Sequence, residues 1–248
     1  MQFLANLLQS ISAYALPTAC IACQQFQGHF ICNECLDQLK ASGLSQYECC
    51  NQCGTLLQFE EIKARHCEQC RKNPPFFDQT FCLARYDDIL QESLHLLKYQ
   101  KRIAFARGLA QAWNQVQIQY MQPIHADYLL PVPLSTQKLL SRGFNQSWEI
   151  ARKLHCHEST QKLMCALKRH HHPKQQAGTP LLLRQDALHR MFYIEKEYID
   201  RMANKTVIVF DDVMTSGATL NEIARTLKNY GVKRVINWVL LRATRLSK

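Results

Sequence analysis

One stretch, residues 207–220, places the strongest constraint on the fold of this 248-residue chain. It reads Val-Ile-Val-Phe-Asp-Asp-Val-Met-Thr-Ser-Gly-Ala-Thr-Leu. The four apolar residues at its start predict a strand that is buried on both faces, as in a parallel sheet. The two acids stand where such a strand should end, and the small residues after them lead into a helical pattern. This order of strand, acids, loop and helix predicts an α/β domain.

The acids and the small residues together form a candidate anion site. In an open α/β sheet, ligands bind just beyond the carboxyl ends of the strands. A small-residue loop that opens a helix directs backbone N–H groups and the positive end of the helix dipole at an anion. The sequence therefore predicts a phosphate cradle beside two carboxylates, Asp211 and Asp212. The simpler alternative is a surface turn in which the Asp pair caps a helix.

The stretch resembles the phosphoribosyl pyrophosphate (PRPP) motif of type I phosphoribosyltransferases, in which four apolar residues and two acids precede a Thr/Ser-Gly-x-Thr loop. The resemblance implies a parallel sheet flanked by helices and a site for PRPP with Mg²⁺. It also implies that Asp211 and Asp212 hold the ribose 2′- and 3′-hydroxyls, for which carboxylates are natural acceptors. Five residues would then wrap the 5′-phosphate, namely Thr215, Ser216, Gly217, Ala218 and Thr219.

Cysteine usage is the second strong signal, because the chain contains twelve cysteines. Eight of them fall into four C-x-x-C pairs, which are Cys20/Cys23, Cys32/Cys35, Cys50/Cys53 and Cys67/Cys70. Two thiolates at this spacing can bind one tetrahedral ion, and two pairs complete a four-thiolate site. We therefore expect two structural Zn²⁺ ions in preference to disulfides or redox chemistry. Sequential pairing is the simplest; cross-braced pairing stays open, and Cys49 is a spare ligand beside Cys50.

The remaining boundaries follow from composition. Residues 1–19 carry no charge and show helical spacing, which predicts an amphipathic helix that packs on the body of the protein. The absence of Lys and Arg there disfavours an export signal and a membrane-surface role, and no stretch is long enough to span a bilayer, so we expect a cytoplasmic protein. Pro74 and Pro75 mark the end of the cysteine-rich module. The predicted parts are a double zinc ribbon over residues 20–73 and a large domain over 79–248.

Strands and helices alternate in the large domain, which predicts a parallel sheet. The predicted strands cover 81–86, 127–133, 207–210 and 235–241, and the helices cover 90–99, 103–120, 147–155 and 218–230. The second strand is followed by Arg142-Gly143-Phe144-Asn145-Gln146 and then a helix, which is another place for an anion. A plain β–α connection is the favoured interpretation of that segment taken alone.

A second resemblance covers nearly the whole chain. Residues 131–134 (Pro-Val-Pro-Leu) with residues 142–146 are similar to the signature of the ComF family. These are predicted phosphoribosyltransferases with an N-terminal zinc module, and some are linked to natural competence for DNA uptake. Leu97-Lys98-Tyr99 also matches, as does the spacing of Arg169, Gln176, Arg184 and Phe192. The chain departs from the pattern at Ala187, where the family usually has Asn.

Residues 168–176 are basic and poorly patterned. Type I phosphoribosyltransferases close a flexible loop over the reaction centre, and a basic lid would screen the pyrophosphate and exclude water. The candidates for this role are Arg142 and the lid residues Arg169, Lys174, Gln176 and Arg184. A metal site at the run of three histidines is disfavoured, because adjacent side chains rarely converge on one ion. No residue stands out as a general base.

Three functional hypotheses follow. The first is a phosphoribosyltransferase with an unknown acceptor, in which Asp211, Asp212 and Arg142 carry the chemistry. The second is a non-catalytic PRPP or nucleotide sensor. The third is a competence factor that binds single-stranded DNA or docks on the DNA-uptake machinery. The net charge of +10 fits phosphorylated ligands and nucleic acid equally well. The cysteine module adds only a modest basic cluster, made of Arg65, His66, Arg71 and Lys72.

Overall fold

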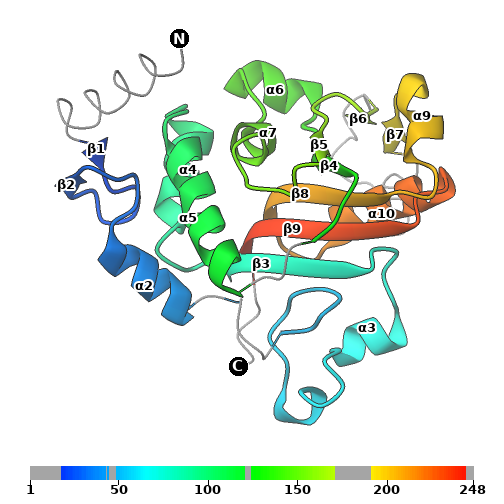
Figure 1. The fold of residues 1–248 in the computed structure, drawn as a ribbon, viewed down its shortest axis with the longest axis horizontal. Helices are drawn as coiled ribbons and strands as arrows, with labels where there is room; N and C mark the ends of the chain where they lie inside the picture. The colour runs from blue at the N-terminus through cyan, green and yellow to red at the C-terminus, as the bar shows by residue number, and fades with distance from the viewer. Residues whose placement is uncertain (1–17, 43, 45–48, 121–123, 171–190, 244–248) are drawn as a thin grey trace, which may run out of the picture.

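A five-stranded parallel sheet forms the centre of the protein (Figure 1). The structure is a computed structural model, and it describes residues 18–42, 44, 49–120, 124–170 and 191–243. The strand order is β3-β9-β8-β4-β5, and every neighbouring pair is parallel, as the alternating pattern predicts. The bounds are β3 (Gln79–Arg85), β4 (Tyr128–Pro131), β5 (Gln161–Lys162), β8 (Thr206–Met214) and β9 (Arg234–Arg242).

Successive residues of β8 point to opposite faces of the sheet and divide the core in two. On one face, Ile208 and Phe210 pack with α4 (Gln91–Tyr99), α5 (Phe105–Tyr120) and α7 (Gln146–Ala151). The indole of Trp113 on α5 lies edge-on to the Phe210 ring, with ring centroids 5.9 Å apart. On the other face, Val207 and Val209 pack under α10 (Ala218–Asn229). This two-sided burial accounts for the unbroken apolar run in the sequence.

Several predicted elements differ in length from the structure. The strand predicted over 127–133 ends at Pro131, and the next residues lead into an unpredicted helix, α6 (Thr136–Arg142). The helix predicted over 147–155 covers only Gln146–Ala151. It stops early because the buried Asn114 side chain holds the backbone of the following segment, donating to Lys153 O at 3.1 Å and accepting from His155 N at 2.7 Å.

Three further small elements lie near the segment that the sequence marks as a lid, and the first of them overlaps its start. Strand β6 (Leu167–Arg169) pairs antiparallel with β7 (Phe192–Ile194), and α9 (Lys196–Met202) comes next. The sequence did not predict this pair, because the three-residue strands are too short to show a clear period.

The first cysteine-rich segment packs on the α4–α5 face of the sheet. It contains β1 (Thr18–Ala19), β2 (Phe26–Gln27) and α2 (Asn33–Ser42). Ile21, Leu36 and Leu39 are buried in the same core cluster as α4 and α5. The Ser93 hydroxyl on α4 donates to Ile21 O at 2.6 Å. Of the helix predicted over residues 1–19, only Thr18 and Ala19 lie within the described residues, and they belong to β1.

The second cysteine-rich segment lies below β3 in Figure 1 and contains the short 3-10 helix η1 (Phe59–Glu61) and α3 (Glu68–Lys72). It has a small core of its own, made of Cys50, Leu57, Cys67 and Cys70. It also joins the α10 side of the main core, against which Cys49 and Cys53 pack. Both segments therefore share their packing with the large domain, and the division near residue 73 stays a prediction from sequence.

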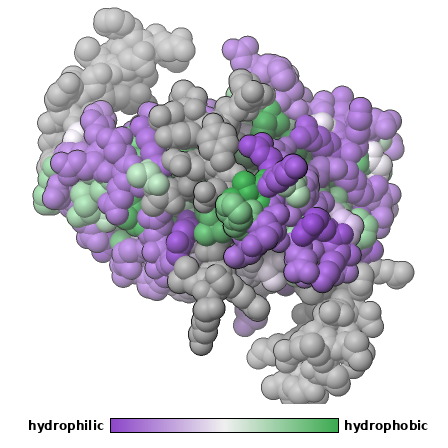
Figure 2. Space-filling view, turned by 90° about the horizontal axis from the view of Figure 1, so that it is seen from below, coloured by the Kyte–Doolittle hydropathy of each residue, from purple (hydrophilic) through white to green (hydrophobic). Residues whose placement is uncertain are grey.

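The described surface is mainly hydrophilic in the view of Figure 2, with only small hydrophobic areas. Some large apolar side chains are exposed, among them Phe26, Phe59 and Leu140, which is usual for folded proteins. Within the described ranges, no helix is both long enough and apolar enough to cross a bilayer.

Candidate functional site

The two acids lie within β8 and not at its end, which corrects the expectation from sequence. Pairing with β4 stops at Phe210, where Val132 N donates to Phe210 O at 2.9 Å. Pairing with β9 continues to Met214, which lies opposite Arg242. Asp211 and Asp212 therefore follow the point at which β8 loses one of its two neighbours. They are 9% and 3% exposed, so their charges need partners inside the protein.

Asp212 has two such partners, from two helices. Lys98, near the end of α4, forms an ion pair with Asp212 Oδ2. Gln146 Nε2 on α7 donates to Asp212 Oδ1 at 3.2 Å. Burial opposes ionisation of Asp212, but the charge and hydrogen bond of Lys98, with help from Gln146, lower its pKa below the usual value. Asp212 is thus the member of the pair that ionises more readily.

The pKa of Asp211 is shifted in the opposite direction. Burial, followed by the neighbouring charge of Asp212, raises the pKa of Asp211 well above its usual value. Its Oδ1 accepts the Asp212 backbone N–H at 2.9 Å. Of the two acids, Asp212 therefore ionises more readily, with Lys98 as its counter-ion, and Asp211 keeps its proton to a higher pH than an ordinary Asp. Such a pair offers both acceptor and donor capacity to a ligand with adjacent hydroxyl groups.

Arg142 belongs to the same polar network. It ends α6, and its guanidinium donates to Gln146 Oε1 and lies 5.7 Å from the Tyr99 ring centroid. Gln146 thus connects Arg142 to Asp212. Asn145 has a local role, because its side chain caps α7 by accepting from Ser147 N at 3.0 Å and donates to Val132 O at 3.0 Å. The 142–146 segment is therefore more than a plain connection, since it supplies one direct partner of an acid.

The predicted phosphate loop connects β8 to α10. Thr215, Ser216 and Ala218 are exposed, while Gly217 is buried at the N-cap of α10 with φ +82. The positive φ favours glycine at this position, and a Cβ at Gly217 would lie 2.6 Å from Met214 Cε, so the end of the Met214 side chain would have to move. The loop opens a helix of twelve residues, and the dipole of that helix favours a negative charge at this end. Thr219 lies in the first turn of α10.

Of the lid candidates, only Arg169 lies among the described residues. It ends β6, its guanidinium lies 5.9 Å from the Phe192 ring centroid, and burial lowers its pKa. Lys174, Gln176 and Arg184 lie outside the described residues. The lid assignment stays a prediction.

The eight paired cysteines gather into two groups that follow sequence order. Cys20, Cys23, Cys32 and Cys35 form one, and Cys50, Cys53, Cys67 and Cys70 form the other; within each group the sulfurs lie within 4.8 Å of one another. The Sγ atoms of Cys23 and Cys32 are 3.9 Å apart, and those of Cys53 and Cys67 are 3.7 Å apart. Four thiolates at about 2.3 Å from one zinc ion give similar separations.

The donor chemistry also fits zinc. Burial raises the pKa of the Cys20 thiol, but backbone N–H groups outweigh it and bring that pKa down to about 7. One of these donors is Cys32 N, 3.4 Å from Cys20 Sγ. All twelve cysteines lie among the described residues, and none of them is in a disulfide there. Cys49 is outside both groups, and its backbone pairs with Leu56. Because each group supplies four protein ligands, a bound zinc ion would be structural.

Three participants at the site were not predicted as site residues. Lys98 lies in the Leu97-Lys98-Tyr99 motif and Gln146 lies in the 142–146 motif. These two motifs were the sequence signal that could have identified them as site residues. The third is Arg242, the last residue of β9, which donates to the carbonyls of Met214 and Thr215 at the start of the loop. It stands just beyond the strand predicted over 235–241, and no local pattern marks it.

Comparisons with known proteins agree with this architecture. Residues 139–247 match the family model described as phosphoribosyl transferase domain. The chain is 28% identical to Competence protein F of Haemophilus influenzae over 217 residues, which cover 86% of this chain and 90% of that protein. It is 26% identical to DNA utilization protein YhgH of Escherichia coli O6:H1 over 243 residues, covering 92% and 98% of the two chains.

Among solved structures, a hypoxanthine phosphoribosyltransferase from Staphylococcus aureus aligns with a TM-score of 0.31 and 15% identity, over 55% of this chain and 62% of that chain. The predicted fold class is confirmed by the matched domain model and the strand order: a phosphoribosyltransferase-like parallel sheet flanked by helices, with two four-cysteine groups that fit zinc ribbons.

Proposed function

We propose that this homologue of Competence protein F and of DNA utilization protein YhgH, with its phosphoribosyl transferase domain, binds PRPP and transfers its phosphoribosyl group to an acceptor. One observation carries the proposal. The buried acids Asp211 and Asp212 lie just beyond the point where β4 leaves β8, and a small-residue loop at the start of α10 follows directly. This arrangement suits a ribose with adjacent hydroxyls and a 5′-phosphate.

Each part of the site has a task in this proposal. Asp211 and Asp212 bind the ribose hydroxyls, and the loop residues 215–219 bind the 5′-phosphate through backbone N–H groups and hydroxyls. Lys98 and Gln146 hold Asp212 in position. Mg²⁺ bound with PRPP would neutralise charge on the pyrophosphate. Arg142 and the basic lid residues supply further positive charge for the leaving group.

The transfer itself is a substitution at C1 of the ribose. The bond from C1 to the pyrophosphate oxygen breaks, and a bond from C1 to the acceptor, a nitrogen base or nucleotide, forms. Pyrophosphate leaves with the electron pair, and the acceptor nitrogen loses a proton to solvent. The protein contributes positioning and charge stabilisation. A non-catalytic sensor would use the same binding residues without turnover.

The test is ligand-dependent stabilisation. PRPP with Mg²⁺ is expected to raise the melting temperature of the intact protein, because a ligand that binds only the folded state stabilises it. The Asp211→Asn, Asp212→Asn variant should lose this shift. Asp127→Asn is a matched control, since Asp127 is a part-exposed acid paired with Lys205 at 3.1 Å. No shift in the intact protein would rule out the ligand. Release of pyrophosphate with a panel of bases then separates transferase from sensor.

A role in DNA uptake is the second candidate function, and both relatives carry names that point to it. A pocket of about 450 Å³ lies between the first cysteine-rich segment and α5. Its lining includes the basic or titratable side chains Arg107, Lys153, His29 and His155, with Phe30 on its wall. Among the described residues that line it, none is acidic. Basic groups beside an aromatic ring suit the phosphates and bases of single-stranded DNA.

This candidate has its own test. The Arg107→Gln, Lys153→Gln variant should bind a single-stranded oligonucleotide more weakly, with a salt slope reduced by about 0.7 for each phosphate that the variant no longer neutralises. The matched control is Arg71→Gln, Lys72→Gln on α3. If only the control variant binds the oligonucleotide more weakly, the DNA binds to the second cysteine-rich segment. If neither variant binds it more weakly, both places are excluded. A cytoplasmic location remains part of the proposal.

A further inference from the structure

Arg242 connects the second cysteine group to the candidate phosphate loop. It is buried, with 7% of its surface exposed. Its Nε donates to the backbone carbonyl of Cys53 at 3.1 Å. Its Nη1 donates to the carbonyls of Met214 at 3.1 Å and Ala243 at 2.7 Å, and also to that of Thr215. One guanidinium therefore holds a residue of the four-cysteine group and the first residues of the loop.

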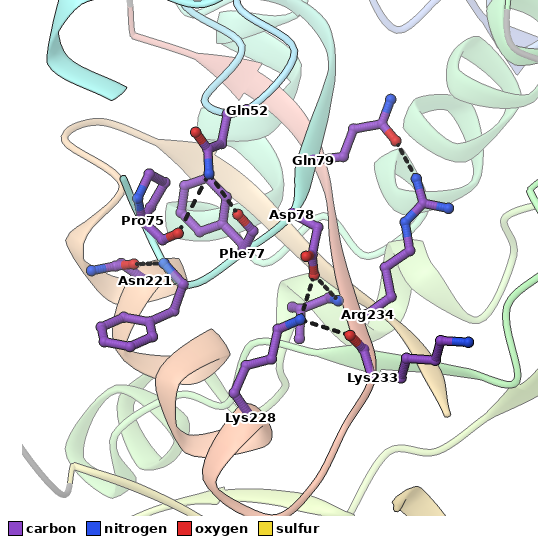
Figure 3. Close-up of polar contacts among 11 residues, drawn as sticks. Gln52, Pro75, Phe77, Asp78, Gln79, Asn221, Lys228, Lys233 and Arg234 are labelled. Carbon is purple, nitrogen blue, oxygen red and sulfur yellow. Dashed lines mark hydrogen bonds and ion pairs between the residues drawn. The ribbon is translucent and has the colours of Figure 1, made fainter. Parts of the chain in front are cut away.

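A second connection joins the same group to the other end of the loop (Figure 3). The Gln52 side chain donates to Pro75 O at 3.4 Å and to Phe77 O at 3.3 Å. Between those two residues, Phe76 N donates to Asn221 Oδ1 at 2.7 Å, and Asn221 lies in the first turns of α10. The 50–53 turn is thus linked to the chain both before and after Gly217.

These connections leave the turn and the loop little freedom. Gly54 has φ +67, and a Cβ there would lie 2.6 Å from Cys82 Sγ, so the backbone after Cys53 lies directly against β3. The Thr80 hydroxyl on β3 donates to Gln52 O at 2.6 Å. On the loop side, the Met214 side chain fills the space beneath Gly217. Because both sides are closely packed, a displacement of the turn must be accommodated by the loop.

The hydrogen bonds of Arg242 also orient the loop. In a trans peptide, the carbonyl and the N–H of the same unit point in opposite directions. Arg242 holds the Met214 and Thr215 carbonyls, so the N–H groups of Thr215 and Ser216 point away from the guanidinium. Outward N–H groups are what an anion-binding loop requires.

We propose that the second four-cysteine group, with zinc bound, is a positioning element for the phosphate loop, and that Arg242 is the positioning residue that connects the two. The proposal rests on the proposed function, since it assumes that the loop binds a 5′-phosphate. Zinc bound by Cys50 and Cys53 would fix the 50–53 turn. The hydrogen bonds of Arg242 to this turn, and to Met214 and Thr215, would then fix the start of the loop relative to the turn.

The first test measures affinity for PRPP with Mg²⁺ by calorimetry, with the zinc content of each variant measured in parallel. Arg242→Met should weaken binding by about tenfold, a typical coupling between two sites, while retaining two zinc ions per chain. Arg242→Lys should weaken it too, because one ammonium cannot reproduce the hydrogen bonds to separate carbonyls. Arg234→Met is the matched control at the other end of β9, where the guanidinium donates to Gln79 Oε1 at 2.8 Å.

The second test uses reciprocity, because coupling between two sites acts in both directions. Cysteines are alkylated in the presence of a chelator that is selective for Zn²⁺ over Mg²⁺ and are identified by peptide mass spectrometry. PRPP with Mg²⁺ should slow alkylation of Cys50, Cys53, Cys67 and Cys70, and leave the rate at Cys20, Cys23, Cys32 and Cys35 unchanged. Arg242→Met should abolish this selective protection, and Asn221→Ala should reduce it.

The outcomes separate the two proposals. If the wild-type protein does not bind PRPP, the proposed function fails. If the wild type binds PRPP but Arg242→Met binds it equally tightly, or PRPP protects both cysteine groups alike, the positioning role fails and the proposed function stands. If Arg242→Met does not fold, the wild-type protection pattern and Asn221→Ala decide the question.

Discussion

Lys98 and Asp212 form a buried ion pair that joins the end of α4 to the centre of the sheet, with side chains 16% and 5% exposed. Two charges removed from water are stable only when each has a partner. The pair therefore fixes where α4 ends relative to β8. It also lowers the pKa of Asp212, while burial and the Asp212 charge raise the pKa of Asp211.

The first prediction concerns this pair. Lys98→Met leaves the Asp212 charge buried without its counter-ion, and should lower the free energy of unfolding by on the order of 3 kcal/mol. Lys205→Met is the matched control, because it removes the more exposed Lys205–Asp127 pair, and should cost less than about 1 kcal/mol. Denaturant titration at neutral pH measures both. Equal losses of unfolding free energy in the two variants would show that the buried pair stabilises the protein no more than the exposed pair does.

The second prediction concerns pH. The pKa of Asp211 is raised in the folded protein by burial and by Asp212, whereas an unfolded Asp has a pKa near about 3.9. Between these two values the folded state binds more protons, so the contribution of Asp211 to stability decreases as pH rises through that window.

The contribution of Asp212 has the opposite sign. Its pKa is lowered in the folded state, so its stabilisation is present above the unfolded pKa and is lost as pH falls through the folded one. Asp211→Asn should therefore lose less stability than the wild type as pH rises above the unfolded pKa of about 3.9. Denaturation midpoints at a series of pH values measure this, and parallel curves for the two proteins would refute the assignment.

The third prediction separates the conformation of the phosphate loop from general backbone strain. Gly217 and Gly143 both have positive φ, at +82 and +86, but only Gly217 faces a close neighbour. Alanine at either position should cost about 1 kcal/mol of stability. Only Gly217→Ala should also abolish the melting-temperature shift given by PRPP, because only that change disturbs the loop. A retained shift in Gly217→Ala would count against the loop as the phosphate site.

The fourth prediction concerns zinc pairing. The intact protein should contain two zinc ions per chain, one in each sequential group. A Cys20→Ser, Cys32→Ser variant changes one group only and should retain one zinc ion. A cross-braced arrangement would place these residues in different sites and lose both ions. Metal analysis of the purified variant distinguishes the two. Cys49→Ser is the control and should keep two ions, because Cys49 lies outside both groups.

Local patterns were sufficient to predict β8, the loop and α10. The apolar run, the two acids and the small residues are contiguous, and each follows a short-range rule of burial or turn formation. The predicted end of the strand was wrong, because β9 continues to pair with β8 beyond Phe210. That extension depends on the length of a neighbour that is distant in sequence.

Contacts between distant segments were not predictable in the same way. Lys98 reaches Asp212 only because the strand order places β8 under α4 and α7. Arg242 gains its role from the register that sets it opposite Met214, and from a cysteine turn 189 positions earlier in the chain. The sequence shows the spacing of the cysteines, but it does not show against which face of the sheet each cysteine group packs.

The position of the second cysteine-rich segment also affects how much of the sheet edge at β3 is open to other molecules. Strand β3 is at one edge of the strand order, and an open edge can pair with a strand of another molecule. Here the outward Thr80 N–H donates to Asn51 O at 3.1 Å, so the 50–53 turn covers part of that edge. If zinc holds the turn as we propose, its loss would uncover this edge, and the expected consequence is self-association of the chain.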